Sequence, residues 1–126
     1  MLEIVSALIC TALTLIVIIF QGCLAFGVPW GEASMGGKYP GKYPPKMRIV
    51  AIINMIILAF IAIIVLSNAD LLLPQLKQIS RIGIWFVVVF FSISTVLNTI
   101  TPSKIERIWA PVAFFQLITS VIVGIS

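Results

Sequence analysis

Two stretches of this 126-residue chain bring tryptophan together with side chains of both charges. The first, residues 27–48, is rich in glycine and proline, and the second, residues 104–109, leads into an apolar run. Acidic and basic side chains can form ion pairs, while glycine and proline shape the backbone around them. We therefore predict one candidate cluster on a single face of the protein, formed by Trp30, Glu32, Arg48, Glu106, Arg107 and Trp109.

Two interpretations of this cluster stay open. In the first, residues 27–46 form a shaped ligand site; in the second, they fold back as a cap, and ion pairs only hold that cap in place. Glu32 is the one acid among the basic residues of this stretch, so we predict that it pairs with Arg48 or Arg107. Breaking such a pair would cost about 3–5 kcal/mol if it is buried and about 0–1 kcal/mol if it is exposed.

Catalytic chemistry has few of its usual groups in this chain, which contains no histidine. Ser34 and Ser103 have no imidazole to activate them as nucleophiles, and a metal or thiol-redox site lacks its usual ligands. Cys10 and Cys23 lie in one apolar run, too far apart to bond to each other, and are expected to pack or to face lipid. We predict no enzymatic activity, no cofactor and no metal, and rank a lipid-modifying enzyme last among the candidate functions.

The elements that must position these residues are apolar helices. Hydrophobic residues make up 61% of the chain and charged residues 10%, whereas soluble domains carry about 25% charged residues. A helix that crosses a bilayer needs about 20 mostly apolar residues, and charge-free runs near that length occur four times. We predict an all-α membrane protein, a four-transmembrane-helix bundle forming one domain over residues 1–126, with helices at about 4–26, 48–69, 81–98 and 104–125.

Basic residues near the helix ends predict the orientation in the membrane. Loops one (27–46) and three (99–103) share one side, and the basic residues on or beside them are Lys38, Lys42, Lys46, Arg48, Lys104 and Arg107. The opposite side has Lys77 and Arg81 in or beside loop two (70–81). The excess of basic residues beside loops one and three predicts that these loops lie in the cytoplasm and that both termini lie outside. The basic residues form no stripe with interleaved aromatics, so no nucleic-acid partner is expected.

The apolar runs contain mildly polar residues but no charged ones. Charges inside a bilayer are costly and usually functional, so their absence from these runs counts against ion-coupled transport and against an intramembrane catalytic pair. The polar residues could line a path for a small solute or join helices through hydrogen bonds. We favour the second interpretation for Gln21, Asn54, Ser92, Ser94, Thr95, Asn98 and Gln116.

Aromatic residues near the predicted helix ends are expected to form an interfacial belt. Their amphipathic rings suit the headgroup layer of a membrane, and this explanation is favoured over ligand stacking. The residues concerned are Trp30, Tyr39, Tyr43, Trp85 and Trp109.

Residues 103–106 match the capping-box pattern, which marks the start of a helix. In this pattern the Ser103 hydroxyl accepts a hydrogen bond from the Glu106 amide, while the Glu106 side chain accepts one from the Ser103 amide. Pro111 lacks the amide hydrogen that would bond the carbonyl of Arg107. We therefore predict that the fourth helix starts near Ser103 and bends near Pro111.

Several of these motifs together resemble a group of small bacterial four-helix membrane proteins. They are Pro29-Trp30-Gly31 after the first helix, Gly36-Gly37, a proline ahead of Arg48 at the second helix, and Glu106-Arg107 at the fourth. The resemblance implies a bacterial four-helix membrane protein and implies no particular activity. We expect the protein to lie in the bacterial cytoplasmic membrane.

The function predicted from these observations is that of a non-enzymatic multi-pass membrane component. It would act through its cytoplasmic loops, in contact with membrane lipids or with a partner, either a second copy of this chain or another membrane protein. The alternative is an oligomeric channel or transporter for a small solute, since four helices alone enclose little space. A long polar lumen would distinguish the alternative from the preferred function.

Overall fold

The computed structural model describes residues 1–33 and 37–126, and only the backbone of Glu32. It contains four α-helices, α1 (Leu2–Ala25), α2 (Pro45–Asn68), α3 (Lys77–Ile100) and α4 (Trp109–Ile125). Short 3₁₀ turns lie between them: η1 (Gly31–Ala33), η3 (Pro74–Leu76) and η4 (Glu106–Ile108). All four spans are long and apolar enough to cross a membrane, and the described residues include no strand. The predicted all-α four-helix class is confirmed.

The helix boundaries differ from the predicted ones mainly at the starts. Helix α2 begins at Pro45, ahead of the predicted residue 48, because proline suits the first helical turn, where its missing amide is not needed. Helix α3 begins at Lys77, four residues ahead of Arg81. Helix α4 begins later than predicted, at Trp109, because residues 104–108 form turns.

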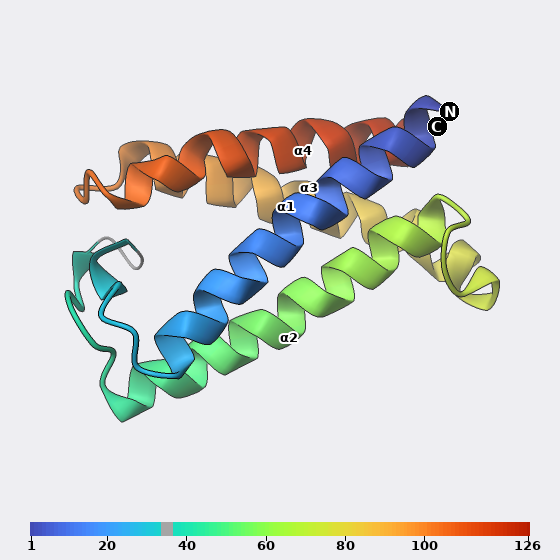
Figure 1. Ribbon diagram of the computed structural model, residues 1–126. Helices are drawn as coiled ribbons and strands as arrows, with labels where there is room; N and C mark the ends of the chain where they lie inside the picture. Colours follow the sequence, from blue (N-terminus) through green and yellow to red (C-terminus); the bar gives the residue numbers. More distant parts are fainter. Residues whose placement is uncertain (34–36) are drawn as a thin grey trace.

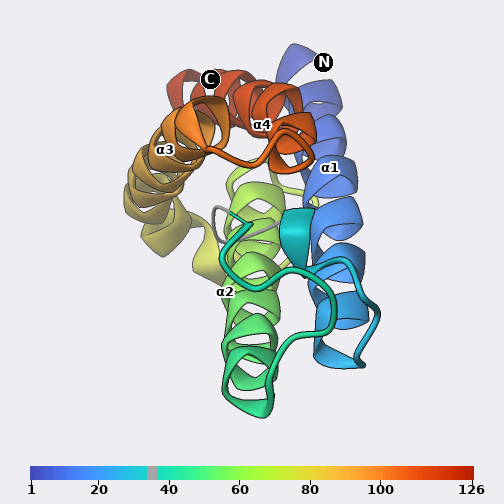
Figure 2. The same cartoon turned by 90° about the vertical axis from the view of Figure 1, so that its left-hand side faces the viewer.

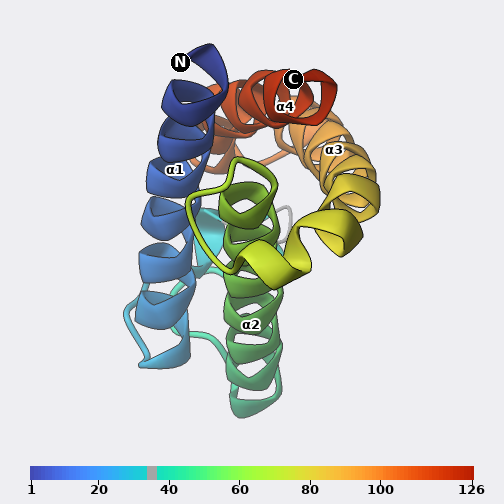
Figure 3. The same ribbon diagram turned by 90° about the vertical axis from the view of Figure 1, so that its right-hand side faces the viewer.

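The helices form two antiparallel hairpins, α1 with α2 and α3 with α4, which cross at an angle (Figure 1). The hairpins meet near the chain termini and diverge toward loops one and three. Figures 2 and 3 show the same bundle from its two ends. The described parts of loop one lie between the diverging ends of the hairpins (Figure 1).

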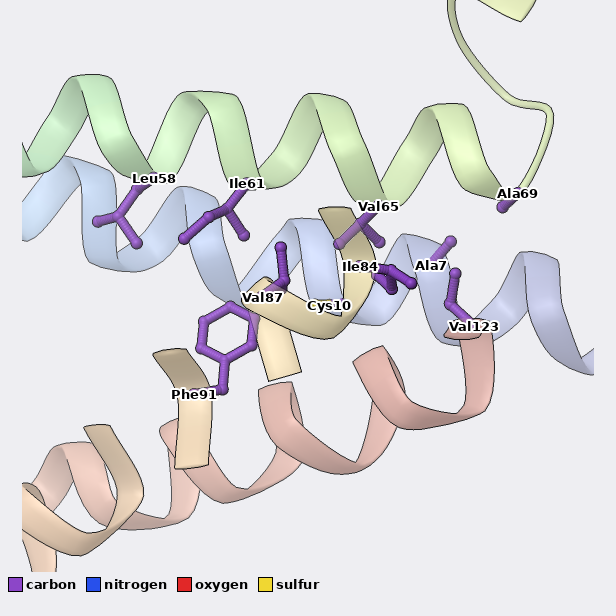
Figure 4. Close-up of a cluster of buried hydrophobic side chains, with 10 residues drawn as sticks. All are labelled: Ala7, Cys10, Leu58, Ile61, Val65, Ala69, Ile84, Val87, Phe91 and Val123. Carbon is purple, nitrogen blue, oxygen red and sulfur yellow. The ribbon is translucent and has the colours of Figure 1, made fainter. Parts of the chain in front are cut away.

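The main core lies where the hairpins meet. Buried side chains from all four helices point toward one another there (Figure 4), among them Cys10, Val65, Ile84, Phe91 and Val123. Between 17% and 28% of each apolar window is buried, so most apolar side chains face outward. An apolar exterior of this extent suits lipid rather than water.

The two ends of the bundle differ in charge. Loops one and three lie at one end, and loop two lies at the other end with both termini (Figure 1). Six of the eight basic residues and two of the four acidic residues belong to the end with loops one and three. The formal net charge of +4 therefore belongs to that end, while the opposite end is balanced.

Hydrogen bonds between helices confirm the packing interpretation for Gln116. Its Nε2 donates to Thr14 Oγ1 at 3.0 Å, joining α4 to α1. Asn68 Nδ2 donates to the carbonyl oxygen of Val123 at 3.1 Å, joining α2 to α4. Within α3, by contrast, Ser92 and Thr95 each donate to the carbonyl four residues earlier in the same helix. The predicted bonding between helices is therefore wrong for the hydroxyl hydrogens of Ser92 and Thr95, which stay within α3.

The capping box is confirmed in one of its two bonds. The Glu106 amide donates to Ser103 Oγ at 3.2 Å, and the Ser103 amide donates to Thr101 Oγ1, also at 3.2 Å. These bonds order the turns before η4 rather than the first turn of α4. Pro111 is the third residue of α4, within the first turn, where no amide donor is required. Pro111 therefore lies in the first turn of α4 rather than inside the helix, which removes the reason for the predicted bend.

Replacing Ser103 with alanine is expected to lower the free energy of unfolding by about 1 kcal/mol, because the buried Glu106 amide loses its acceptor. Thermal unfolding in one detergent measures the change. Ser103→Thr keeps the hydroxyl and should stay near the wild-type melting temperature. Equal losses for both substitutions would show that the hydroxyl is not the stabilising group.

Candidate functional site

The described parts of loop one, residues 27–33 and 37–46, are held in shape by glycines and by the side chain of Arg48. The Gly31 amide donates to the carbonyl oxygen of Gly41 at 2.9 Å, so the loop closes on itself. Gly27, Gly37 and Gly41 have positive φ values of 91°, 75° and 78°, which favour glycine. Arg48 Nε donates to the carbonyl of Tyr43 at 3.0 Å, and its guanidinium lies against Gly27. Arg48 thus joins the two ends of loop one.

Trp109 joins loop one to the other hairpin. Its Nε1 donates to the carbonyl oxygen of Ala33 at 3.0 Å. Its ring lies against the ring of Phe20 in α1, with centroids 4.7 Å apart. One side chain at the start of α4 therefore contacts both loop one and α1, and its N–H bonds the protein rather than a lipid headgroup.

The expected aromatic belt is present only in part. Trp30 is 53% exposed and Trp85 is 45% exposed, as residues at a membrane surface would be. Tyr43, in contrast, is buried beneath loop one at 3% exposure, and its ring meets the edge of Tyr39 with centroids 6.0 Å apart. The belt interpretation is wrong for Tyr43, which serves as a core residue of the loop.

An apolar groove lies on one side of loop one, with a cavity volume of about 490 Å³. Helix α1, loop one and the turns that lead into α4 supply its walls, which consist of Ile16, Ile19, Phe20, Cys23, Pro29, Trp30, Ala33, Ile105, Ile108 and Trp109. We call this cavity the tryptophan groove. Two members of the predicted cluster, Trp30 and Trp109, share it.

Two basic residues are direct sequence neighbours of residues that line the tryptophan groove. Lys104 and Arg107 are exposed, and in sequence they alternate with the groove residues Ile105 and Ile108. Arg107 Nε donates to the carbonyl oxygen of Thr101 at 3.1 Å, which ties the side chain to loop three. A guanidinium has five N–H donors in all, so Arg107 can bind an anion while it keeps this bond.

Glu106 lies on the other side of loop one. It is 8% exposed and lines two cavities, of about 300 Å³ and 520 Å³. These cavities share Leu97, Asn98 and Glu106, and the smaller one also meets Gln21 and Asn54. We call the smaller one the amide pocket. Sequence reasoning did not predict it, although its polar residues lie toward the loop-one ends of three predicted helices.

The predicted cluster is therefore divided by loop one. Trp30 and Trp109 line the tryptophan groove, Arg107 flanks it, Glu106 faces the amide pocket, and Arg48 anchors the loop. The side chain of Glu32 lies outside the described part of the chain, so its pairing with Arg48 or Arg107 stays a prediction. Two interpretations of the cluster were left open, a structural cap and a ligand site. The cap interpretation fits the described parts of loop one, and the groove beside them has the shape of a ligand site.

The described residues contain no group of three or more His, Cys, Asp or Glu side chains that could hold a metal ion. Cys10 is buried in the core and Cys23 lines the tryptophan groove, and both are free thiols. Comparisons with protein-family models, with curated proteins and with solved structures find no match for this chain. No family is therefore assigned by similarity.

Proposed function

We propose that this protein is a non-enzymatic, multi-pass component of the bacterial cytoplasmic membrane that binds anionic phospholipid through the end formed by loops one and three. The observation that carries the proposal is the tryptophan groove, an apolar cavity with Lys104 and Arg107 beside it. An acyl chain would occupy the groove, and a phosphate would contact the basic side chains.

The size and walls of the groove fit an acyl chain. Its volume of about 490 Å³ lies within the range of about 300–1,000 Å³ typical of small-molecule sites. Its walls are made of aliphatic, aromatic and small side chains, and Ile16 and Ile19 at its edge are 50% and 66% exposed. Since lipid surrounds helices of this kind, an acyl chain can enter from the side.

The charge at this end fits an anionic headgroup. Arginine binds phosphate through paired N–H donors, and a basic residue near the membrane surface contributes about 1 kcal/mol to anionic-lipid binding. The whole formal net charge of +4 belongs to this end. An anionic lipid is therefore favoured over a neutral one by the same residues that flank the groove.

Removing these charges should weaken anionic-lipid binding about fivefold for each residue, since about 1 kcal/mol corresponds to that factor. We would reconstitute Lys104→Gln, Arg107→Gln and the double variant in the background Trp85→Phe, and measure tryptophan quenching by phosphatidylglycerol with brominated acyl chains. Arg81→Gln at the opposite end is the matched control and should change little. Equal quenching in all variants would contradict the proposal.

The orientation is tested by labelling from one side of the membrane. Cysteines at Lys42 and Gln78, in a background with Cys10→Ala and Cys23→Ala, should react from opposite sides with an impermeant maleimide. Because basic residues favour the cytoplasm, Lys42→Cys should label only after the cells are broken. Labelling of Lys42→Cys in intact cells would place loops one and three outside.

A further inference from the structure

Two half-buried carboxamides in the membrane-spanning helices have no hydrogen-bond partner among the described residues. They belong to Gln21 in α1 and Asn54 in α2, both half-buried, and both line the amide pocket. Away from water, a carboxamide without a partner costs free energy. Since the two face one cavity from different helices, the simplest source of partners is a polar group bound in that cavity.

The remaining polar wall favours a positively charged donor. Asn98 Nδ2 donates to the carbonyl oxygen of Ser94 at 2.7 Å, which directs its amide hydrogens into α3 while Oδ1 remains an acceptor. The Glu106 carboxylate adds a negative charge to the same wall. Acceptor oxygens are therefore available on Gln21, Asn54, Asn98 and Glu106, alongside the N–H donors of Gln21 and Asn54. Because the carboxylate makes this wall negative, an ammonium group, with three N–H donors, suits the acceptors.

The openings of the pocket favour an amphiphile over a soluble amine. On the lipid side the pocket is bordered by Ile93 and Leu97 of α3, which are 55% and 57% exposed. The adjoining cavity, of about 520 Å³, shares Leu97, Asn98 and Glu106 with the pocket and extends to Lys38 in loop one. A ligand in the two cavities would meet carboxylate and amides at one end, a lysine at the other and lipid along its side.

We propose that the amide pocket and its adjoining cavity bind the headgroup of an aminophospholipid, the phosphatidylethanolamine class. The primary ammonium bonds Glu106 and the carboxamides of Gln21 and Asn54, and the phosphate lies toward Lys38. This site lies across loop one from the tryptophan groove, uses different residues, and does not depend on anionic-lipid binding there.

The test compares phospholipids that differ only in the headgroup, using the full chain in detergent and native mass spectrometry. Phosphatidylethanolamine should bind at least about tenfold more tightly than phosphatidylcholine, because a trimethylammonium group has no N–H donor and hydrogen bonds to charged groups are strong. Asn54→Leu and Gln21→Leu should each abolish most of this preference. Phosphatidylglycerol binding, which tests the tryptophan groove, should stay unchanged in both variants.

Melting temperatures distinguish headgroup binding by the two carboxamides from a purely structural role. Because Asn54 bonds no described residue, Asn54→Leu should keep or raise the melting temperature while it removes the headgroup preference. The control is Gln116→Leu, which breaks the bond to Thr14 and should lower the melting temperature but keep the preference. Equal binding of the two lipids by the wild-type protein, or an undiminished preference in Asn54→Leu, would overturn the proposal and leave a pocket that holds water.

Discussion

Replacing Gly31 with alanine is expected to lower the free energy of unfolding by about 3 kcal/mol and to displace loop one. A Cβ at this position would lie 1.9 Å from the carbonyl oxygen of Tyr39 and 2.8 Å from that of Gly41. Both neighbours are backbone atoms, so no side-chain rotation can relieve the overlap, and overpacking of this kind is strongly destabilising. Thermal unfolding in one detergent, with circular dichroism as the signal, measures the loss.

Gly83 supplies the matched control for this substitution. A Cβ at Gly83 would lie 3.5 Å from the side chain of Ile64, an ordinary van der Waals distance. Gly83→Ala should therefore be neutral or stabilise α3 by up to about 1 kcal/mol, the helix-propensity difference between the two residues. Equal melting temperatures for Gly31→Ala and the wild type would show that loop one does not pack on itself as described.

Replacing Trp109 with alanine is expected to cost about 3 kcal/mol, the lower range for large-to-small substitutions of aromatic residues. The substitution removes the contact with Phe20 and the hydrogen bond to the carbonyl of Ala33. Trp109→Phe keeps a ring and loses only that bond, so it should cost about 1 kcal/mol. The two costs separate ring packing from the indole N–H in the attachment of loop one.

Trp30 provides the comparison for Trp109. It lines the same groove but is 53% exposed, so Trp30→Ala should change the melting temperature much less. Because it removes one wall of the groove, it should still reduce quenching by brominated phosphatidylglycerol. Equal destabilisation by Trp30→Ala and Trp109→Ala would contradict the central position given to Trp109.

The helices could be predicted from the sequence because a long run of apolar residues can be recognised without knowing how the chain packs. Runs without charge located all four spans, and four spans place loops one and three at one end by connectivity. The predicted starts of α2 and α3 are too late, because Pro45 and Lys77 belong to first turns at the ends of the spans. A proline suits a first turn, and a lysine at a helix end can extend its charge to the surface.

The candidate site could be predicted only in part, because its arrangement depends on packing. Glu106 and Arg107 are neighbours in sequence, yet one faces the amide pocket and the other is exposed beside the tryptophan groove. Adjacent residues of a helical turn point in different directions, and charge alone does not reveal which direction is inward. The convergence of Gln21, Asn54 and Asn98 likewise depends on the angle between the two hairpins.

The most direct measurement for the proposed lipid-binding function is an experimental structure of the full chain in a bilayer that contains phosphatidylglycerol. We expect elongated density in the tryptophan groove between Trp30 and Trp109, continuous with a phosphate near Lys104 or Arg107. A groove closed by the protein's own side chains, with both basic residues directed into solution, would contradict the account.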